Sequence, residues 1–126
     1  MNLVLTESVY YILLSLVPPR HGYGIMQEAE RLSDGRVRLA AGTLYGALNS
    51  LCEKGWIVPI PSAEDSRKKE YKLTEKGLTV LKNELNRLRQ LVENGESILK
   101  EELLWLSGKQ SRNGSGFGNL RKRKSG

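Results

Sequence analysis

The chain has 126 residues, 39% of them hydrophobic, which is enough for one small domain with a modest core and an appendage. Its single cysteine excludes a disulfide within the chain, and no apolar run approaches the roughly 20 residues that a membrane span needs, so we expect a cytoplasmic protein. The net charge of +6 resides in residues 107–126, because the 14 basic residues before them equal the 14 acidic ones. The overall charge is therefore no argument for nucleic acid.

The first predicted helix begins after Thr6, whose hydroxyl can cap it, and ends before Pro18. Apolar residues follow at helical spacing, but its other side is apolar too, which a lone small domain rarely needs. We therefore expect this second side to be buried against a partner. The inward set is Val9, Ile12, Leu13, Leu16 and Val17, and the partner-facing set is Tyr10, Tyr11 and Leu14.

Two more helices follow. One is predicted from about Tyr23 to Leu32, after a turn at residues 21–24. Charged and apolar residues then alternate at 36–39, which predicts a short strand. The next helix begins near Gly42-Thr43 and ends at Lys54 before a glycine. Its apolar side is Leu44, Ala47, Leu48 and Leu51.

A hairpin and a long helix complete the pattern. Residues 56–60 and 69–73 read as strands around a polar loop, and the prolines of the first strand place it at a sheet edge. The long helix opens at Thr74-Glu75. Its leucines form a narrow seam suited to a facing helix, with charged residues such as Glu84 expected in solvent. Gly95 is expected to kink or end the helix, leaving 98–106 as a separate segment. The seam comprises Leu78, Leu81, Leu85, Leu88, Val92 and Leu99.

This order of elements is that of a winged helix-turn-helix, in which the third helix enters the major groove and the hairpin, or wing, touches the DNA backbone. We therefore predict a mainly α fold with a small β-hairpin and a long C-terminal dimerisation helix. Its parts would be a DNA-binding domain at 1–77, a helical dimerisation segment at 78–106 and a disordered basic tail at 107–126.

The outer face of the third helix carries short, mostly polar side chains that can approach base edges and phosphates. An asparagine amide can pair with adenine through two hydrogen bonds. Three consecutive cations at the wing could hold phosphates, although a short basic run is more often a solvated surface. The helix face comprises Thr43, Gly46, Asn49, Ser50 and Glu53, and the wing cations are Arg67, Lys68 and Lys69.

Three segments of the chain resemble the PadR family of transcriptional regulators, over about residues 3–80. They are His21-Gly22-Tyr23-Gly24-Ile25, the stretch from Gly42-Thr43-Leu44-Tyr45-Gly46-Ala47-Leu48 to Glu53-Lys54-Gly55-Trp56-Ile57, and Arg67-Lys68-Lys69-Glu70-Tyr71-Lys72-Leu73-Thr74-Glu75-Lys76-Gly77.

The resemblance implies a homodimer on palindromic operator DNA, with C-terminal helices that pair with the partner's first and last helices. Many such regulators are repressors released by small aromatic compounds or drugs. By this resemblance Thr43, Tyr45, Asn49 and the wing cations would contact DNA. The predicted dimer residues are Tyr10, Tyr11, Leu14, Leu81, Leu85, Leu88, Val92 and Leu99.

Other residues admit alternative interpretations. The only histidine, His21, is more plausible as a turn residue than as a metal ligand or part of a triad, and we expect no metal, no cofactor and no enzymatic activity. Cys52 is expected to be a small buried apolar group rather than a redox sensor. Tyr11 and Trp105 could line an aromatic effector pocket or simply pack at the dimer interface. The alternative function is a winged-helix module that binds another protein.

Overall fold

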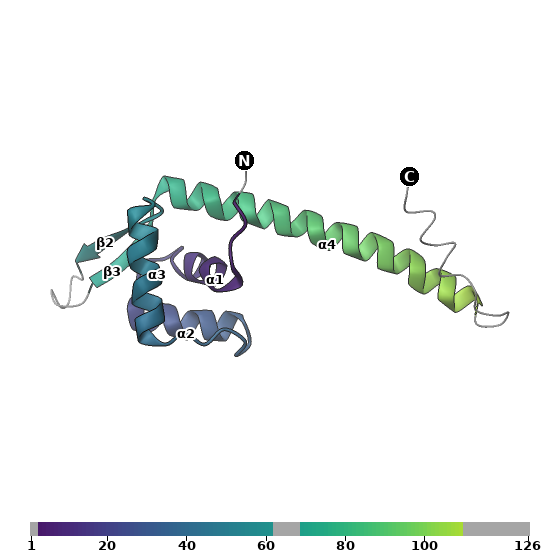
Figure 1. Ribbon diagram of the computed structural model, residues 1–126, viewed down its shortest axis with the longest axis horizontal. Helices are drawn as coiled ribbons and strands as arrows, with labels where there is room; N and C mark the ends of the chain where they lie inside the picture. Colours follow the sequence, from purple (N-terminus) through teal and green to yellow (C-terminus); the bar gives the residue numbers. More distant parts are fainter. Residues whose placement is uncertain (1–2, 62–68, 110–126) are drawn as a thin grey trace. The chain divides into compact units, whose positions relative to one another are not determined.

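The structure, a computed structural model, describes residues 3–61 and 69–109 and confirms a mainly helical fold with a small antiparallel sheet (Figure 1). The contacts divide the chain into two compact units, with the boundary between Asn86 and Arg87. The elements in chain order are α1 (Glu7–Ser15), β1 (Arg20–His21), α2 (Gly22–Leu32), α3 (Ala41–Glu53), β2 (Ile57–Pro61), β3 (Lys69–Leu73) and α4 (Glu75–Lys109).

Helix α1 begins as its sequence predicts, because the Thr6 hydroxyl accepts a hydrogen bond from the Val9 amide at 3.2 Å. The residues predicted to face inward are buried at three positions and half-buried at Val9. Val17 is 61% exposed, so its predicted burial is wrong. The helix ends at Ser15, and helical spacing no longer governs a side chain beyond that point.

The sheet has the strand order β1-β3-β2, and both pairings are antiparallel. The strand predicted at 36–39 is wrong, because Arg20-His21 supplies the third strand by pairing with Tyr71 and Glu70. Residues 36–39 form a loop in which Val37 is buried and its amide donates to the Ser33 hydroxyl at 2.8 Å. Strand β2 lies at the edge, as its prolines predict.

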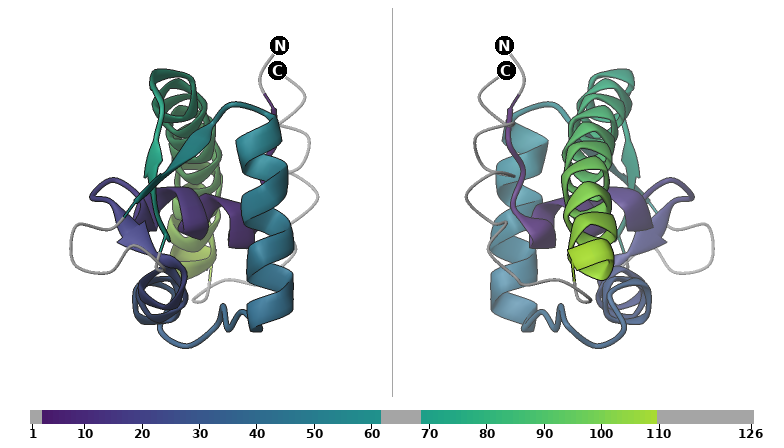
Figure 2. Two further views of the ribbon diagram at one scale, coloured as in Figure 1. Left: turned by 90° about the vertical axis from the view of Figure 1, so that its left-hand side faces the viewer. Right: turned by 90° about the vertical axis from the view of Figure 1, so that its right-hand side faces the viewer.

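The core of the first unit lies where α1, α2 and α3 meet the sheet. Figure 2 shows α3 along one outer face, in front in the left-hand view and faint in the right-hand view. Apolar burial from one side of each helix holds this arrangement together. The buried cluster includes Ile12, Leu13, Leu16, Ile25, Leu44, Leu48, Leu51, Trp56, Ile57 and Tyr71.

The first turn of α4 lies directly on the backbone at the start of the hairpin. The Thr74 amide donates to the Trp56 carbonyl at 3.0 Å, and the Thr74 hydroxyl donates to the Gly55 carbonyl at 2.6 Å. A Cβ atom built on Gly77 would overlap the Trp56 carbonyl oxygen and lie 2.9 Å from its carbonyl carbon. Glycine at 77 therefore permits the close approach that places α4 against β2.

Helix α4 continues without interruption through Gly95 to Lys109, so the predicted kink and the separate segment at 98–106 are wrong. A helical glycine costs only about 1 kcal/mol relative to alanine, which the neighbouring helix-favouring residues can offset. The basic tail was predicted from residue 107, but 107–109 are helical, and 110–126 lie outside the described residues. None of the helices in the described ranges combines the length and the apolar composition needed to cross a membrane.

The first three turns of α4 contribute to the core of the first unit rather than to an open seam. Leu81 is 5% exposed and belongs to that core, so its predicted role facing a partner is wrong. Glu84, predicted in solvent, is 2% exposed, and its carboxylate accepts a hydrogen bond from the Leu5 amide at 3.2 Å. The N-terminal segment thus covers this side of the helix, a contact between residues 79 positions apart that periodicity cannot reveal.

Candidate nucleic-acid interface

The outer face of α3 is open to solvent along its length. The leucines at 44, 48 and 51 are buried, whereas every residue predicted on the opposite face is exposed. A Cβ atom built on Gly42 or Gly46 would meet nothing within 4 Å. The arrangement leaves a helix face of small polar groups uncovered in the described part of the chain. The exposed set is Thr43, Tyr45, Gly46, Asn49, Ser50 and Glu53.

The N-terminus of α3 has free hydrogen-bonding capacity. Its N-cap is Ala40, and no side chain caps the helix there. Ala41 and Gly42 are exposed, so the backbone N–H groups of the first turn can serve an external acceptor. Helix N-termini favour phosphate for this reason and through the helix dipole. Sequence reasoning missed this feature because the cap position was not assigned.

Two arginines precede α3 in the loop that was predicted as a strand. Arg36 pairs with Glu7, and the Arg38 guanidinium lies 3.6 Å from the Glu30 carboxylate. Both arginines are exposed, and exposed ion pairs contribute little to stability, so a phosphate could replace the carboxylate partners. The sequence does contain a signal for these possible phosphate contacts, since two arginines stand just before the third helix.

Tyr45 connects α3 to the start of α2. Its side chain is 46% exposed, and its hydroxyl lies over Gly22, where a Cβ atom would overlap it. The turn before α2 is held by His21, whose Nδ1 atom accepts a hydrogen bond from the Gly24 amide at 3.3 Å. This capping contact confirms the structural interpretation of His21, and the glycine after it admits the Tyr45 ring.

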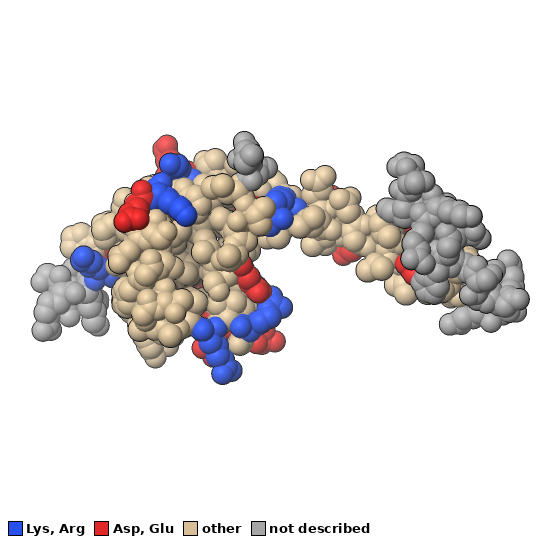
Figure 3. All heavy atoms as spheres, in the orientation of Figure 1, with Lys and Arg blue, Asp and Glu red and all other residues tan. Residues whose placement is uncertain are grey.

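The hairpin starts next to the C-terminal end of α3, and its strands run away from that helix toward the loop (Figure 2). In Figure 1 the ends of β2 and β3 next to the loop reach past α3 on the same side of the first unit. Lys69 and Lys72 on β3 are exposed, whereas the predicted wing cations Arg67 and Lys68 lie outside the described residues. The surface over α3 is uncharged along most of its length in Figure 3. Electrostatic attraction for an anion would therefore come from cations that flank this face rather than from the face itself.

Cys52 lies half-buried at the end of α3. Burial raises the pKa of its thiol above the ordinary value, and the positive charge of Lys69 opposes this only in part. A thiol that resists ionisation is a poor nucleophile and a poor redox sensor. The geometry agrees with its predicted role as a small apolar group.

The predicted dimer residues differ in exposure. In the first unit Tyr10, Tyr11 and Leu14 are half-buried, and the two tyrosine rings meet edge to face with centroids 6.0 Å apart. Leu85 is exposed. In the second unit Leu88 is half-buried and the other predicted positions are exposed. Three further leucines, which the seam did not include, are exposed as well. The exposed apolar residues of the second unit are Leu91, Val92, Leu99, Leu103 and Leu104.

Comparison with known proteins connects this arrangement to DNA-binding regulators. A sequence model of the "Transcriptional regulator PadR-like family" matches residues 9–83, and no curated protein matches the chain. RosR of H. salinarum is similar in structure at 27% identity, with 81% of this chain and 96% of RosR covered and a TM-score of 0.58. A PadR family transcriptional regulator from Eggerthella lenta is 25% identical, with 72% and 80% covered and a TM-score of 0.57. A winged-helix DNA-binding protein from STIV, 20% identical over 70% of this chain and 95% of its own, shares the fold with a TM-score of 0.57.

Proposed function

Since the chain belongs to the PadR-like family of transcriptional regulators, we propose that it is a homodimeric repressor that binds a palindromic operator in the cytoplasm. The observation that carries the proposal is the outer face of α3, where small polar side chains are exposed opposite three buried leucines. A recognition helix must present such a face to fit into the major groove.

In the proposed complex the Asn49 side chain forms hydrogen bonds with a base edge. The other residues of this face lie close to the DNA; they are Thr43, Tyr45, Gly46 and Ser50. The wing cations, of which only Lys69 lies among the described residues, contact the flanking phosphates. The uncapped start of α3 adds backbone donors for a phosphate.

The dimer in this proposal is formed through the apolar side chains of the second unit, together with Leu85 and the half-buried residues of α1. Exposed leucines at this density are costly in water and favour burial against a second copy. A twofold axis would set two α3 helices about 34–36 Å apart, one turn of DNA. Tyr11 and Trp105, both half-buried, are the proposed positions for a small aromatic effector.

The test is selection of bound duplexes from a random DNA pool, followed by affinity measurements on the recovered site. An inverted repeat is expected, and its absence from the selected pool would contradict the proposal. Asn49→Ala should lose about 1–3 kcal/mol on the matched site and little on a site changed at one base pair. Lys69→Ala should weaken binding to both sites equally and reduce the salt dependence of the affinity. The matched control is Lys82→Ala, which removes an exposed lysine on α4.

One observation favours a second candidate function, a module that binds another protein through α3. The surface over α3 is uncharged along most of its length in Figure 3, which suits a protein partner as well as a DNA groove. Affinity for random duplex DNA, measured against salt, separates the two. A steep decrease with salt is expected for the regulator, and a flat, weak response would favour the protein partner.

A further inference from the structure

Helix α3, the proposed DNA-contacting helix, carries no cation of its own. Among the side chains of Ala41–Glu53 the only charged one is the carboxylate of Glu53. Affinity for DNA depends largely on lysines and arginines that neutralise phosphates. The cations that serve this helix must therefore stand before it or after it in the chain, or on the hairpin.

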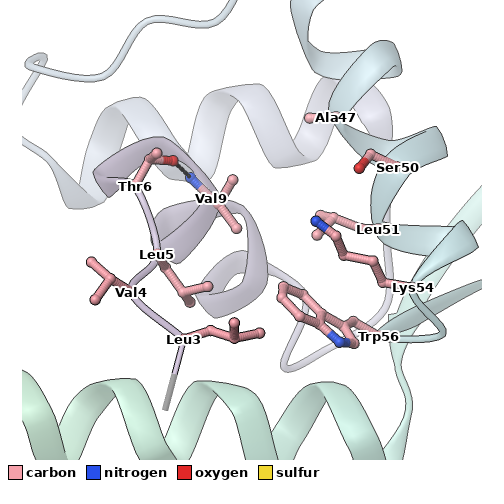
Figure 4. A pocket seen from close by; sticks show the side chains of 10 residues that line it. All are labelled: Leu3, Val4, Leu5, Thr6, Val9, Ala47, Ser50, Leu51, Lys54 and Trp56. Atoms are coloured by element: carbon pink, nitrogen blue, oxygen red, sulfur yellow. Dashed lines mark hydrogen bonds between the residues drawn. The ribbon is translucent and has the colours of Figure 1, made fainter. Parts of the chain in front are cut away.

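The first cation after α3 faces another part of the molecule. Lys54 directly follows the helix, and its ammonium nitrogen lies 5.2 Å from the centre of the Trp56 ring. Figure 4 shows this side chain extended toward the N-terminal segment, beside Leu51. Leu51 is buried on the apolar side of α3, opposite the exposed polar face. Lys54 is therefore not placed to serve that face.

The two cations before α3 are held in an ordered loop. Arg36 and Arg38 stand between α2 and α3, on the segment that leads into the start of α3 in Figure 2. Val37 between them is buried, and its amide donates to the Ser33 hydroxyl at 2.8 Å. Burial of the middle residue leaves its neighbours outside, and the two arginine side chains are 68% and 75% exposed. The loop thus presents two guanidinium groups to solvent at a fixed place.

The second of these arginines lies close to the uncapped start of α3. Arg38 precedes the N-cap residue Ala40 by two positions, so their Cα atoms are at most about 8 Å apart. A DNA strand whose phosphate accepts the free N–H groups of the first turn would therefore pass within reach of the Arg38 guanidinium. Arg36, two residues earlier, can serve a further phosphate of the same strand.

Both guanidinium groups already have a carboxylate partner. The Nε atom of Arg38 lies 3.6 Å from the carboxylate of Glu30 on α2, and Arg36 pairs with Glu7, the first residue of α1. Exposed pairs of this kind are weak, whereas a phosphate offers the guanidinium two parallel hydrogen bonds. Each carboxylate must be displaced before its arginine can hold a phosphate, and its charge repels that phosphate.

We propose that Arg38 and Arg36 contact DNA phosphates and that Glu30 and Glu7 lower the affinity by competing for them. This inference rests on the proposed DNA-binding function and adds a control of its strength. When DNA binds, each arginine exchanges a carboxylate for a phosphate. The two carboxylates therefore tune the affinity for DNA of any sequence, whereas the exposed face of α3 selects the sequence.

The test measures the affinity of the full chain for a short duplex of random sequence as a function of salt, since phosphate contacts are independent of sequence. Arg38→Gln should lower the affinity and reduce the slope of log affinity against log salt by about 1 for each bound protomer. Glu30→Gln should raise the affinity at low salt roughly threefold, the scale of one exposed ion pair. In the Arg38→Gln background most of this gain should disappear. The corresponding cycle of Glu7→Gln and Arg36→Gln should behave in the same way.

The matched control is Asp34→Asn, which removes a negative charge from the same loop but belongs to neither ion pair. Asparagine tolerates the left-handed backbone at this position, where φ is 55°. Its gain in affinity measures general repulsion of DNA and should be the same with and without Arg38. Competition is refuted if Glu30→Gln gains no more than this control, or gains as much without Arg38 as with it.

Failure of this inference can be told apart from failure of the proposed function. A wild type that binds the duplex, with an affinity and a salt slope that Arg38→Gln and Arg36→Gln leave unchanged, would overturn the phosphate contacts alone. A wild type that binds no duplex at low salt would overturn them together with the DNA-binding function.

Discussion

The close contact between α4 and the hairpin gives the sharpest stability prediction, through Gly77→Ala. The new methyl group would overlap the Trp56 carbonyl oxygen and lie 2.9 Å and 3.2 Å from the carbonyl carbon and Cα of the same residue. Carbon atoms pack at about 3.5 Å or more, and these neighbours are backbone atoms that cannot rotate away. The first turn of α4 must therefore move off the hairpin.

The expected change in the free energy of unfolding of Gly77→Ala follows from three contributions. Overpacking costs about 1–3 kcal/mol, and the movement weakens the two hydrogen bonds of Thr74, worth about 1 kcal/mol each. Replacement of a helical glycine by alanine returns up to about 1 kcal/mol. We expect Gly77→Ala to lower the free energy of unfolding by about 2–3 kcal/mol.

Urea denaturation followed by circular dichroism measures this difference. With a slope of about 1–3 kcal/mol per molar urea, the midpoint should fall by roughly 0.7–3 M. The matched control is Gly95→Ala on the same helix, where a Cβ atom meets nothing within 4 Å. This change should raise the free energy of unfolding by up to about 1 kcal/mol. All variants are compared at one protein concentration, because the stability of the proposed dimer would depend on it.

The essential result is that the two glycine variants change the free energy of unfolding in opposite directions. If Gly77→Ala were as stable as the wild type, the close approach of α4 to the hairpin would be incorrect. If Gly95→Ala destabilised the protein as much as Gly77→Ala, the loss would reflect alanine in this helix in general and not the contact with Trp56.

Three further predictions concern the first unit. Gly22→Ala should displace the Tyr45 ring and lower the free energy of unfolding by about 1 kcal/mol. The same change should cost nothing in a Tyr45→Ala background, and urea denaturation measures both. Equal costs in the two backgrounds would contradict the contact between Gly22 and Tyr45. Burial raises the pKa values of Cys52 and Tyr71, so the folded state resists their ionisation, and stability should fall as the pH rises above about 8.5 and then above 10. Unfolding measured from pH 8 to 11 should show this decrease, smaller in Cys52→Ala and in Tyr71→Phe, and a flat profile would contradict it. The Glu84 carboxylate holds the N-terminal segment through the Leu5 amide, so Glu84→Leu should speed amide hydrogen exchange in that segment. Glu84→Gln keeps an acceptor and should not. Identical exchange rates in both variants would exclude the hydrogen bond as the cause.

Several parts of the candidate interface could be predicted from short-range signals. Thr6 caps α1 because a cap depends on three neighbouring residues, and the leucines at 44, 48 and 51 face inward because helical period alone sets their direction. The same period places Asn49 and Ser50 on the exposed side. The outer face of α3, which we propose contacts DNA, could therefore be predicted from the sequence alone.

The errors about the third strand and the start of α4 arose where the partner of a segment lies far along the chain. The alternating residues at 36–39 suit a strand, yet β3 pairs with Arg20-His21, which carries no strand pattern of its own. The leucine seam did not reveal that its first turns face the core, where Leu81 is buried and Glu84 holds Leu5.

The amino-acid sequence by itself determined which segments are helical, where most of them begin and which side of α3 is apolar, because caps and periodicity are local properties. The tertiary structure alone decided which strand completes the sheet and how much of α4 belongs to the core. Strand pairing and burial depend on residues that meet only when the chain has folded, so no local pattern specifies them.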